Sequence, residues 1–211
     1  MYDVVLFLHI LGVVTLVTAL AFSLGGLFAA QRASDVSGIR SALNFVPVAE
    51  KLIPPAMITI LAAGLYLVGN GHWGWGTGWV DVALAIFAVM MVLGPGVEGK
   101  RIGAMHEKVA ETPDGRIPPE LDAMRADPVL THVATFGSTQ IVVFLYLMTN
   151  KPSLGGALLT AAIGAAVSMP LARLALRLSV HAAQGAQPFR PAVVPEADPA
   201  EAIGLGSARD A

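Results

Sequence analysis

The feature that most constrains this chain is an uncharged apolar stretch over residues 4–30, which contains one histidine, His9. A helix needs roughly 20 apolar residues to cross the hydrocarbon core of a bilayer, and this stretch exceeds that length. No Lys or Arg precedes it, and it continues past Ala19-Leu20-Ala21, a triplet that resembles a signal-peptide cleavage site. The stretch therefore predicts a transmembrane helix and not a cleaved signal peptide.

Four further apolar runs follow, over residues 53–69, 80–97, 129–148 and 154–176. Each is about long enough to span a bilayer, and a spanning segment of this kind must be helical to pair its own backbone groups. We predict an all-α, polytopic membrane helical bundle with four core transmembrane helices and a fifth, C-terminal one. The domain prediction is a core over residues 1–152, an additional helix over 153–181 and a disordered cytoplasmic tail over 182–211, which is rich in Gly, Pro and Gln.

Composition limits the classes of function. Only 13% of the residues are charged, against about 25% in soluble domains, so the lipid bilayer is the expected partner. A net charge of −2 gives no reason to expect a nucleic-acid partner. The chain has no cysteine, which excludes thiolate metal ligands and thiol catalysis. Metalloprotease, dinucleotide, P-loop and nucleophile-elbow motifs are all missing, so no motif indicates an enzyme.

The basic residues predict the orientation. Of the 13 Lys and Arg residues, all except Lys151 lie after the first run, after the third run, or in the end of the fifth run (Arg173) and the tail that follows it. The positive-inside rule places these segments and the C-terminus in the cytoplasm, and the N-terminus outside. The aromatic residues agree, because Trp73, Trp75 and Trp79 lie in the second loop, where indole rings favour the headgroup level.

Local signals predict the details of the loops. Pro54-Pro55 suits the first turn of the second spanning helix, and Gly94-Pro95-Gly96 predicts a kink or break near the end of the third. Residues 101–110 are expected to prolong the third spanning helix into the cytoplasm, and residues 118–126 to form a short surface helix. Asp127-Pro128 is expected to be the cap and first turn of the fourth spanning helix. In the fifth run a small residue recurs at every fourth position, which favours close helix approach and predicts a homo-oligomer or another helix–helix partner. These residues are Gly156, Thr160, Gly164 and Ser168.

His9 is the sharpest functional candidate, because an ionisable residue inside a span is costly and is often functional. At helical spacing it lies beside an arc of small and polar residues, which predicts that it faces other helices and not lipid. The arc consists of Gly12, Thr15, Ala19, Ser23, Gly26 and Ala30. Two interpretations remain: His9 binds a cofactor, or its neutral imidazole hydrogen-bonds to a neighbouring helix.

Other polar side chains form weaker candidates. His72, in the outer loop near the end of the bundle that holds His9, is a second candidate metal ligand. His132, Thr135 and Gln140 give the fourth spanning helix a polar side, which either lines a path for a small solute or makes interhelical hydrogen bonds.

Three short motifs appear in a characteristic order: Leu8-His9-Ile10-Leu11-Gly12, then Pro55-Ala56-Met57, then the run from Leu147 to Pro152. On these the chain resembles a bacterial family of predicted integral membrane proteins of unknown function. That family is distantly similar to the copper-resistance D proteins and to the haem-associated membrane protoporphyrinogen oxidase. The resemblance covers about residues 1–152 and implies a protein of the bacterial inner (plasma) membrane.

The resemblance also implies a cofactor. It places His9 at the position of a helix-one histidine thought to serve haem, so haem b or copper is the expected ligand. Met148 is the expected second ligand, because the fourth spanning helix runs outward and brings it to the level of His9. If the chain is an enzyme, the resemblance implies a membrane oxidoreductase of the protoporphyrinogen oxidase type. The alternative is a cofactor-free bundle that acts as an assembly partner or carries a small solute.

Overall fold

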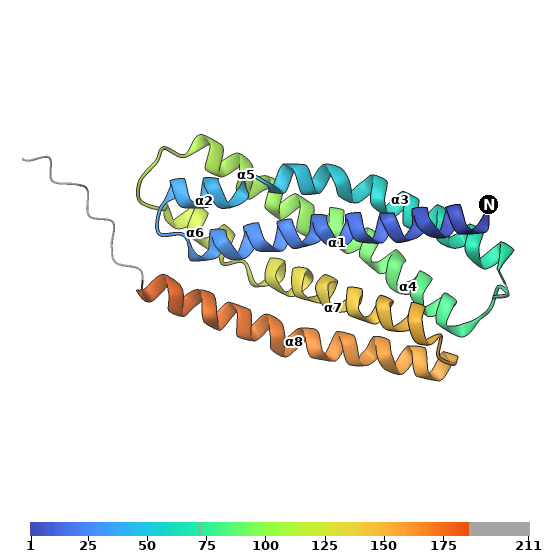
Figure 1. The fold of residues 1–211 in the computed structure, drawn as a ribbon. Coiled ribbons are helices and arrows are strands. Elements are labelled where there is room, and N and C mark those ends of the chain that lie inside the picture. The colour runs from blue at the N-terminus through green and yellow to red at the C-terminus, as the bar shows by residue number, and fades with distance from the viewer. Residues whose placement is uncertain (72, 186–211) are drawn as a thin grey trace, which may run out of the picture.

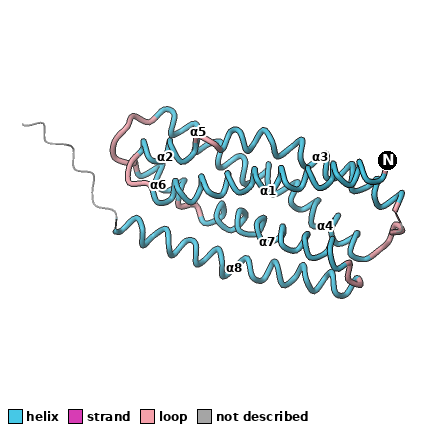
Figure 2. The backbone as a smooth tube through the Cα atoms, viewed as in Figure 1, coloured by secondary structure: helices cyan, strands magenta, loops and turns pink. Residues whose placement is uncertain are grey.

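The computed structural model describes residues 1–71 and 73–185, and every regular element in this part of the chain is a helix. Five of these helices are long and apolar enough to cross a bilayer, which confirms the predicted polytopic bundle (Figures 1 and 2). The long elements are α1 (Tyr2–Arg32), α3 (Val46–Asn70), α4 (Gly78–Leu93), α7 (Pro128–Asn150) and α8 (Leu154–Gly185). The shorter ones are α2 (Val36–Leu43), the π-helix η1 (Gly94–Gly99), α5 (Lys100–Glu111) and α6 (Pro119–Arg125).

The helices run along one long axis and form two associated groups. Helix α1 packs mainly on α3, whereas α4 and α7 both contact α8 (Figure 1). The N-terminus, the α3–α4 loop and the α7–α8 turn lie at one end of the bundle, which we call the tryptophan end because it carries Trp73, Trp75 and Trp79. The opposite end holds α2, α5 and α6, and we call it the arginine end, after Arg40 and Arg125.

Small residues set the approach of α1 to its neighbours. Gly12, Ala19 and Ser23 are all buried, which confirms that the predicted small-residue arc faces other helices. A Cβ at Gly12 would lie 3.0 Å from Ile60 Cγ1 of α3. The opposite face of α1 is open, and Phe7 is 62% exposed. Since side chains gain little by leaving lipid for protein, close backbone approach is what holds two such helices together.

The first loop differs from the prediction. The sequence placed the start of the second spanning helix near residue 53, but α3 begins at Val46 and the separate helix α2 precedes it. Pro54 and Pro55 therefore lie inside α3 and not in its first turn. The reason is tertiary, because Val36 and Val46, 0% and 1% exposed, pack into a core that residues far along the chain complete.

At Gly94-Pro95-Gly96, where a kink or break is predicted, the regular α-helix is interrupted, since residues 94–99 form a π-helix between α4 and α5. Proline cannot donate a backbone hydrogen bond inside a helix, and the wider turn of a π-helix accommodates that defect. Helix α5 continues directly from η1, which confirms the predicted prolongation of the third helix, and α6 confirms the short helix predicted over residues 118–126. Asp127 caps α7 as predicted, because its carboxylate accepts a 2.8 Å hydrogen bond from Val129 N.

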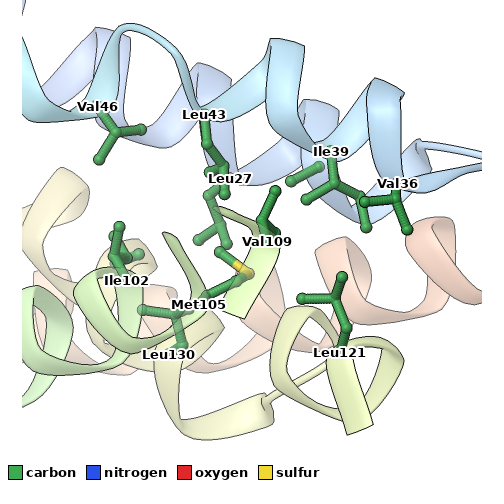
Figure 3. Close-up of a cluster of buried hydrophobic side chains, with 12 residues drawn as sticks. Leu27, Val36, Ile39, Leu43, Val46, Ile102, Met105, Val109, Leu121 and Leu130 are labelled. Carbon is green, nitrogen blue, oxygen red and sulfur yellow. The ribbon is translucent and has the colours of Figure 1, made fainter. Parts of the chain in front are cut away.

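A compact hydrophobic core lies at the arginine end, where six helices meet (Figure 3). Helix α5 presents Ile102, Met105 and Val109 to this core, each no more than 2% exposed. The other members come from α1, α2, α3, α6 and α7 and are Leu27, Ala30, Val36, Ile39, Leu43, Val46, Leu121, Leu130 and Ala134. This end of the molecule is therefore packed like the interior of a soluble domain.

Two arginines satisfy helix C-termini beside that core. Arg125, 7% exposed, donates from Nη1 to the carbonyl oxygens of Ala30 and Ala33 at 3.1 and 2.7 Å, and it also bonds the Asp122 carboxylate. Arg40 donates in the same way to the carbonyls that end α5. The last carbonyls of a helix have no partner within the helix and carry partial negative charge, so a guanidinium is a favourable cap.

Replacing Arg125 with alanine should lower the free energy of unfolding by about 2–3 kcal/mol, because it leaves buried carbonyls without their charged donor. Thermal unfolding of the detergent-solubilised protein measures the change. The exposed Arg116→Ala is the matched control and should stay close to the wild type. Equal effects of the two substitutions would contradict the capping role.

The orientation remains a prediction, and the structure supplies clean sites to test it. A Cβ at Gly74, in the α3–α4 loop, would meet nothing within 4 Å, and Arg116 is exposed in the α5–α6 loop. In intact cells a membrane-impermeant thiol reagent should label Gly74→Cys and leave Arg116→Cys unlabelled. The wild type has no cysteine and gives no background. The reverse labelling pattern would overturn the orientation.

Candidate functional site around His9

His9 lies in the tryptophan-end half of α1 and turns toward α3. Its Nδ1 is 3.0 Å from the carbonyl oxygen of Ile60. A carbonyl can only accept, so Nδ1 must carry a proton and donate it. In the neutral ring this leaves Nε2 unprotonated, with its lone pair free to accept a hydrogen bond or bind a metal.

Gly64 makes room for the imidazole. A Cβ at Gly64 would lie 3.2 Å from His9 Cε1 and 3.5 Å from His9 Nδ1. Gly64 also stands one helical turn after Ile60, so the carbonyl and the glycine form a continuous seat for the ring on α3. The prediction that His9 faces a neighbouring helix agrees with this geometry. Sequence reasoning did not identify Ile60 or Gly64, since no pattern in one helix names its partner on another.

The other residues expected near His9 are placed differently. Met148 lies on α7 and is 38% exposed, whereas its buried neighbour Leu147 packs among residues of α4 and α8. The structure therefore packs His9 against α3, whereas Met148 lies on an exposed face of α7. His72 lies outside the described residues. Within the part of the chain that is described, no group of three or more His, Cys, Asp or Glu side chains could hold a metal ion.

The polar side of α7 is largely occupied within the helix itself. His132 Nδ1 lies 2.7 Å from the carbonyl oxygen of Pro128, and the Thr135 hydroxyl donates to the Thr131 carbonyl at 2.7 Å. One interhelical bond does occur at the arginine end, where Gln31 Nε2 of α1 donates to Thr131 Oγ1 at 3.1 Å. His132 and Thr135 thus make hydrogen bonds within α7 and do not form a site together with His9.

Gln140 is the exception on α7. Its side chain is 1% exposed, and its Nε2 is buried without a hydrogen-bond partner. A Cβ at Gly164 of α8 would lie 3.3 Å from this nitrogen and would clash with Val143. Gly164 therefore allows α8 to close over Gln140. A buried amide nitrogen without a partner among the described residues typically costs about 1–3 kcal/mol, so Gln140 lowers the stability of this interface.

The small-residue stripe of α8 serves contacts inside the chain. Gly164 and Ser168 are buried, and α8 packs along α7 (Figure 1). The hydroxyls of Thr160 and Ser168 donate to carbonyls of their own helix. The predicted close approach is thus made with α7, and the predicted homo-oligomer or external helix partner stays a prediction.

The fold and its exposed apolar faces define a multi-pass helical membrane protein. The family model described as "Predicted integral membrane protein (DUF2269)" matches residues 3–152, and the chain belongs to this family. The match ends two residues before α8 begins. No curated protein and no solved structure matches the chain.

Replacing Gly64 with leucine should displace the His9 ring and weaken α1–α3 packing, with a loss of about 1–3 kcal/mol in the free energy of unfolding. Thermal unfolding in detergent is the measurement. Gly25→Leu on α1 is the matched control, because a Cβ there meets nothing within 4 Å. If both variants unfold at the same temperature, Gly64 does not form a seat for His9.

Proposed function

We propose that this protein binds a haem group in the membrane and that Nε2 of His9 is the axial ligand. The observation that carries the proposal is the 3.0 Å contact between His9 Nδ1 and the Ile60 carbonyl. Histidines that bind metals usually donate their other ring nitrogen to a carbonyl or carboxylate, which fixes the tautomer and the direction of the ring. The Leu8-His9-Ile10-Leu11-Gly12 resemblance to haem-associated membrane proteins points the same way.

Haem suits the available side chains better than copper does. A porphyrin supplies four nitrogen ligands itself, so one imidazole from the protein is enough to hold its iron. A copper ion in a protein needs several donor side chains, and within the described residues no group of three His, Cys, Asp or Glu side chains offers them. Met148, 38% exposed on α7, is not a ready second donor.

In this proposal the chain itself orients the ligand. The Ile60 carbonyl accepts the Nδ1 proton and so fixes the tautomer, and Gly64 leaves room for the ring against α3. A haem bound there would supply one-electron redox chemistry. No acid–base or nucleophilic group accompanies His9 in its described contacts with Ile60 and Gly64, so binding or electron transfer is favoured over an oxidase activity of the protoporphyrinogen oxidase type.

The second candidate function is a cofactor-free bundle that acts as an assembly partner. It is favoured by the same hydrogen bond, since a histidine that joins α1 to α3 already has a structural role. A carrier for a small polar solute has less support, because the hydroxyls of Thr135, Ser138 and Thr139 donate to carbonyls of their own helix.

Location and organisation complete the proposal. The protein is placed in the bacterial plasma membrane with its N-terminus outside, so that His9 lies in the outer half of the bilayer. We take residues 1–152 as the functional core and α8 as an addition that covers α7. Of the predicted cytoplasmic tail over residues 182–211, the first four residues belong to α8 and the rest lie outside the described residues. The small-residue stripe of α8 then stabilises the bundle and is not required for the cofactor.

The visible spectrum of the detergent-purified protein tests the proposal. The wild type should show a haem Soret band, and His9→Ala and His9→Gln should both lose it, because glutamine replaces the hydrogen bonds of histidine but is a poor ligand for iron. His132→Gln, a change at the other described half-buried histidine of a spanning helix, should keep the band. A colourless, well-folded wild type would exclude haem, and a Soret band retained in His9→Gln would leave His9 as a packing residue only.

A further inference from the structure

An open groove of about 440 Å³ lies between α1, α7 and α8 in the arginine-end half of the bundle. Leu24 and Phe28 form one wall on α1, and Leu171 and Ala175 form the other on α8. Helix α7 lies between them and contributes Thr135, Ser138, Thr139 and Val142. The groove is thus bounded by the first helix and by the two consecutive helices α7 and α8, and His9 is not part of its lining.

The groove is lined mainly by apolar side chains, and the three hydroxyl side chains that it contains are already hydrogen-bonded. The hydroxyl of Thr135 donates to the Thr131 carbonyl, that of Ser138 to Ala134, and that of Thr139 to Phe136, all at 2.7–2.8 Å. No hydroxyl proton on α7 is left for a ligand in the groove. What these residues present is methyl, methylene and bonded oxygen, beside Leu, Phe, Val and Ala side chains. A hydrocarbon chain can pack on such a surface without loss, whereas a polar solute would lose its hydrogen bonds to water and gain none from the groove.

The arginine end of the groove carries positive charge. Arg32 stands four residues after Phe28 and eight after Leu24, so it lies on the same side of α1, one turn nearer the end of the bundle. Arg32 is exposed, and it makes no ion pair with any residue that the structure describes. The nearby Arg125 differs, because its guanidinium is held by helix carbonyls and Asp122.

We propose that this groove binds an anionic phospholipid, with one acyl chain along α7 between α1 and α8 and the phosphate beside Arg32. Along the axis of the bundle, the apolar groove is followed by the basic residue Arg32, just as the acyl chain of a phospholipid is followed by its headgroup. The end of α1 at Arg32 marks the limit of its uncharged run, which is where lipid phosphates lie. This proposal does not depend on which face of the membrane the arginine end occupies, because both leaflets have phosphates at the headgroup level.

Native mass spectrometry of the full chain in detergent, with phosphatidylglycerol or phosphatidylcholine of identical acyl chains, tests the proposal. The wild type should bind phosphatidylglycerol more tightly, and Arg32→Gln should reduce that preference by on the order of fivefold, the effect of one basic residue at an anionic surface. Arg173→Gln, which removes the same charge from an exposed position on α8 outside the groove lining, should keep the preference.

A second pair of variants tests the acyl-chain site. Ala175→Trp fills the groove and should reduce the binding of both lipids, whereas Leu174→Trp, on the exposed face of α8, should not. Thermal unfolding of each variant checks that it is folded. Equal binding of the two lipids to the wild type, or equal losses in Arg32→Gln and Arg173→Gln, would overturn the proposal. Unchanged binding in a folded Ala175→Trp variant would do the same.

Discussion

The structure depends on a close contact between helices that the hydrophobic effect alone does not supply. Apolar side chains of a spanning helix are as well solvated by lipid as by another helix, so α1 and α3 associate through backbone proximity. Gly12 lets α1 approach Ile60, and Gly26 lets it approach the carbonyl of Ala42, which a Cβ would meet at 2.9 Å. Gly164 gives α8 the same closeness to α7. The bundle is therefore held along its length by small residues.

The arginine end follows a different physical rule. There the chain leaves the apolar runs, and α2, α5 and α6 bury large side chains as a soluble protein does (Figure 3). Burial of a Leu or Ile side chain from water is worth about 1.5–3 kcal/mol, and Leu27, Ile39, Ile102 and Leu121 are all nearly inaccessible. Arg40 and Arg125 close the helix ends beside this core. The arginine end is thus stabilised by the burial of apolar side chains from water, whereas the spanning part is stabilised by close packing of helix backbones.

His9 gains its significance from this arrangement. In a helix that packs through small residues, a neighbour's backbone comes near enough for an imidazole to reach the Ile60 carbonyl. That bond selects a tautomer and leaves one nitrogen uncommitted, which is compatible with a ligand and with a packing contact. The groove between α1, α7 and α8 has the opposite character, because its hydroxyls are bonded within α7 and offer a lipid chain an apolar surface.

The sequence by itself determined the number of spanning helices, the interruption of the α-helix at Gly94–Gly96, the cap at Asp127 and the inward side of His9. These features rest on local rules: span length, proline geometry, side-chain capping and helical periodicity. Only the tertiary structure decided that α3 begins at Val46, that Ile60 and Gly64 receive His9, and that Arg125 caps α1. Each of these depends on a contact between helices distant in the chain, and periodicity within one helix states which side is buried but not what it is buried against.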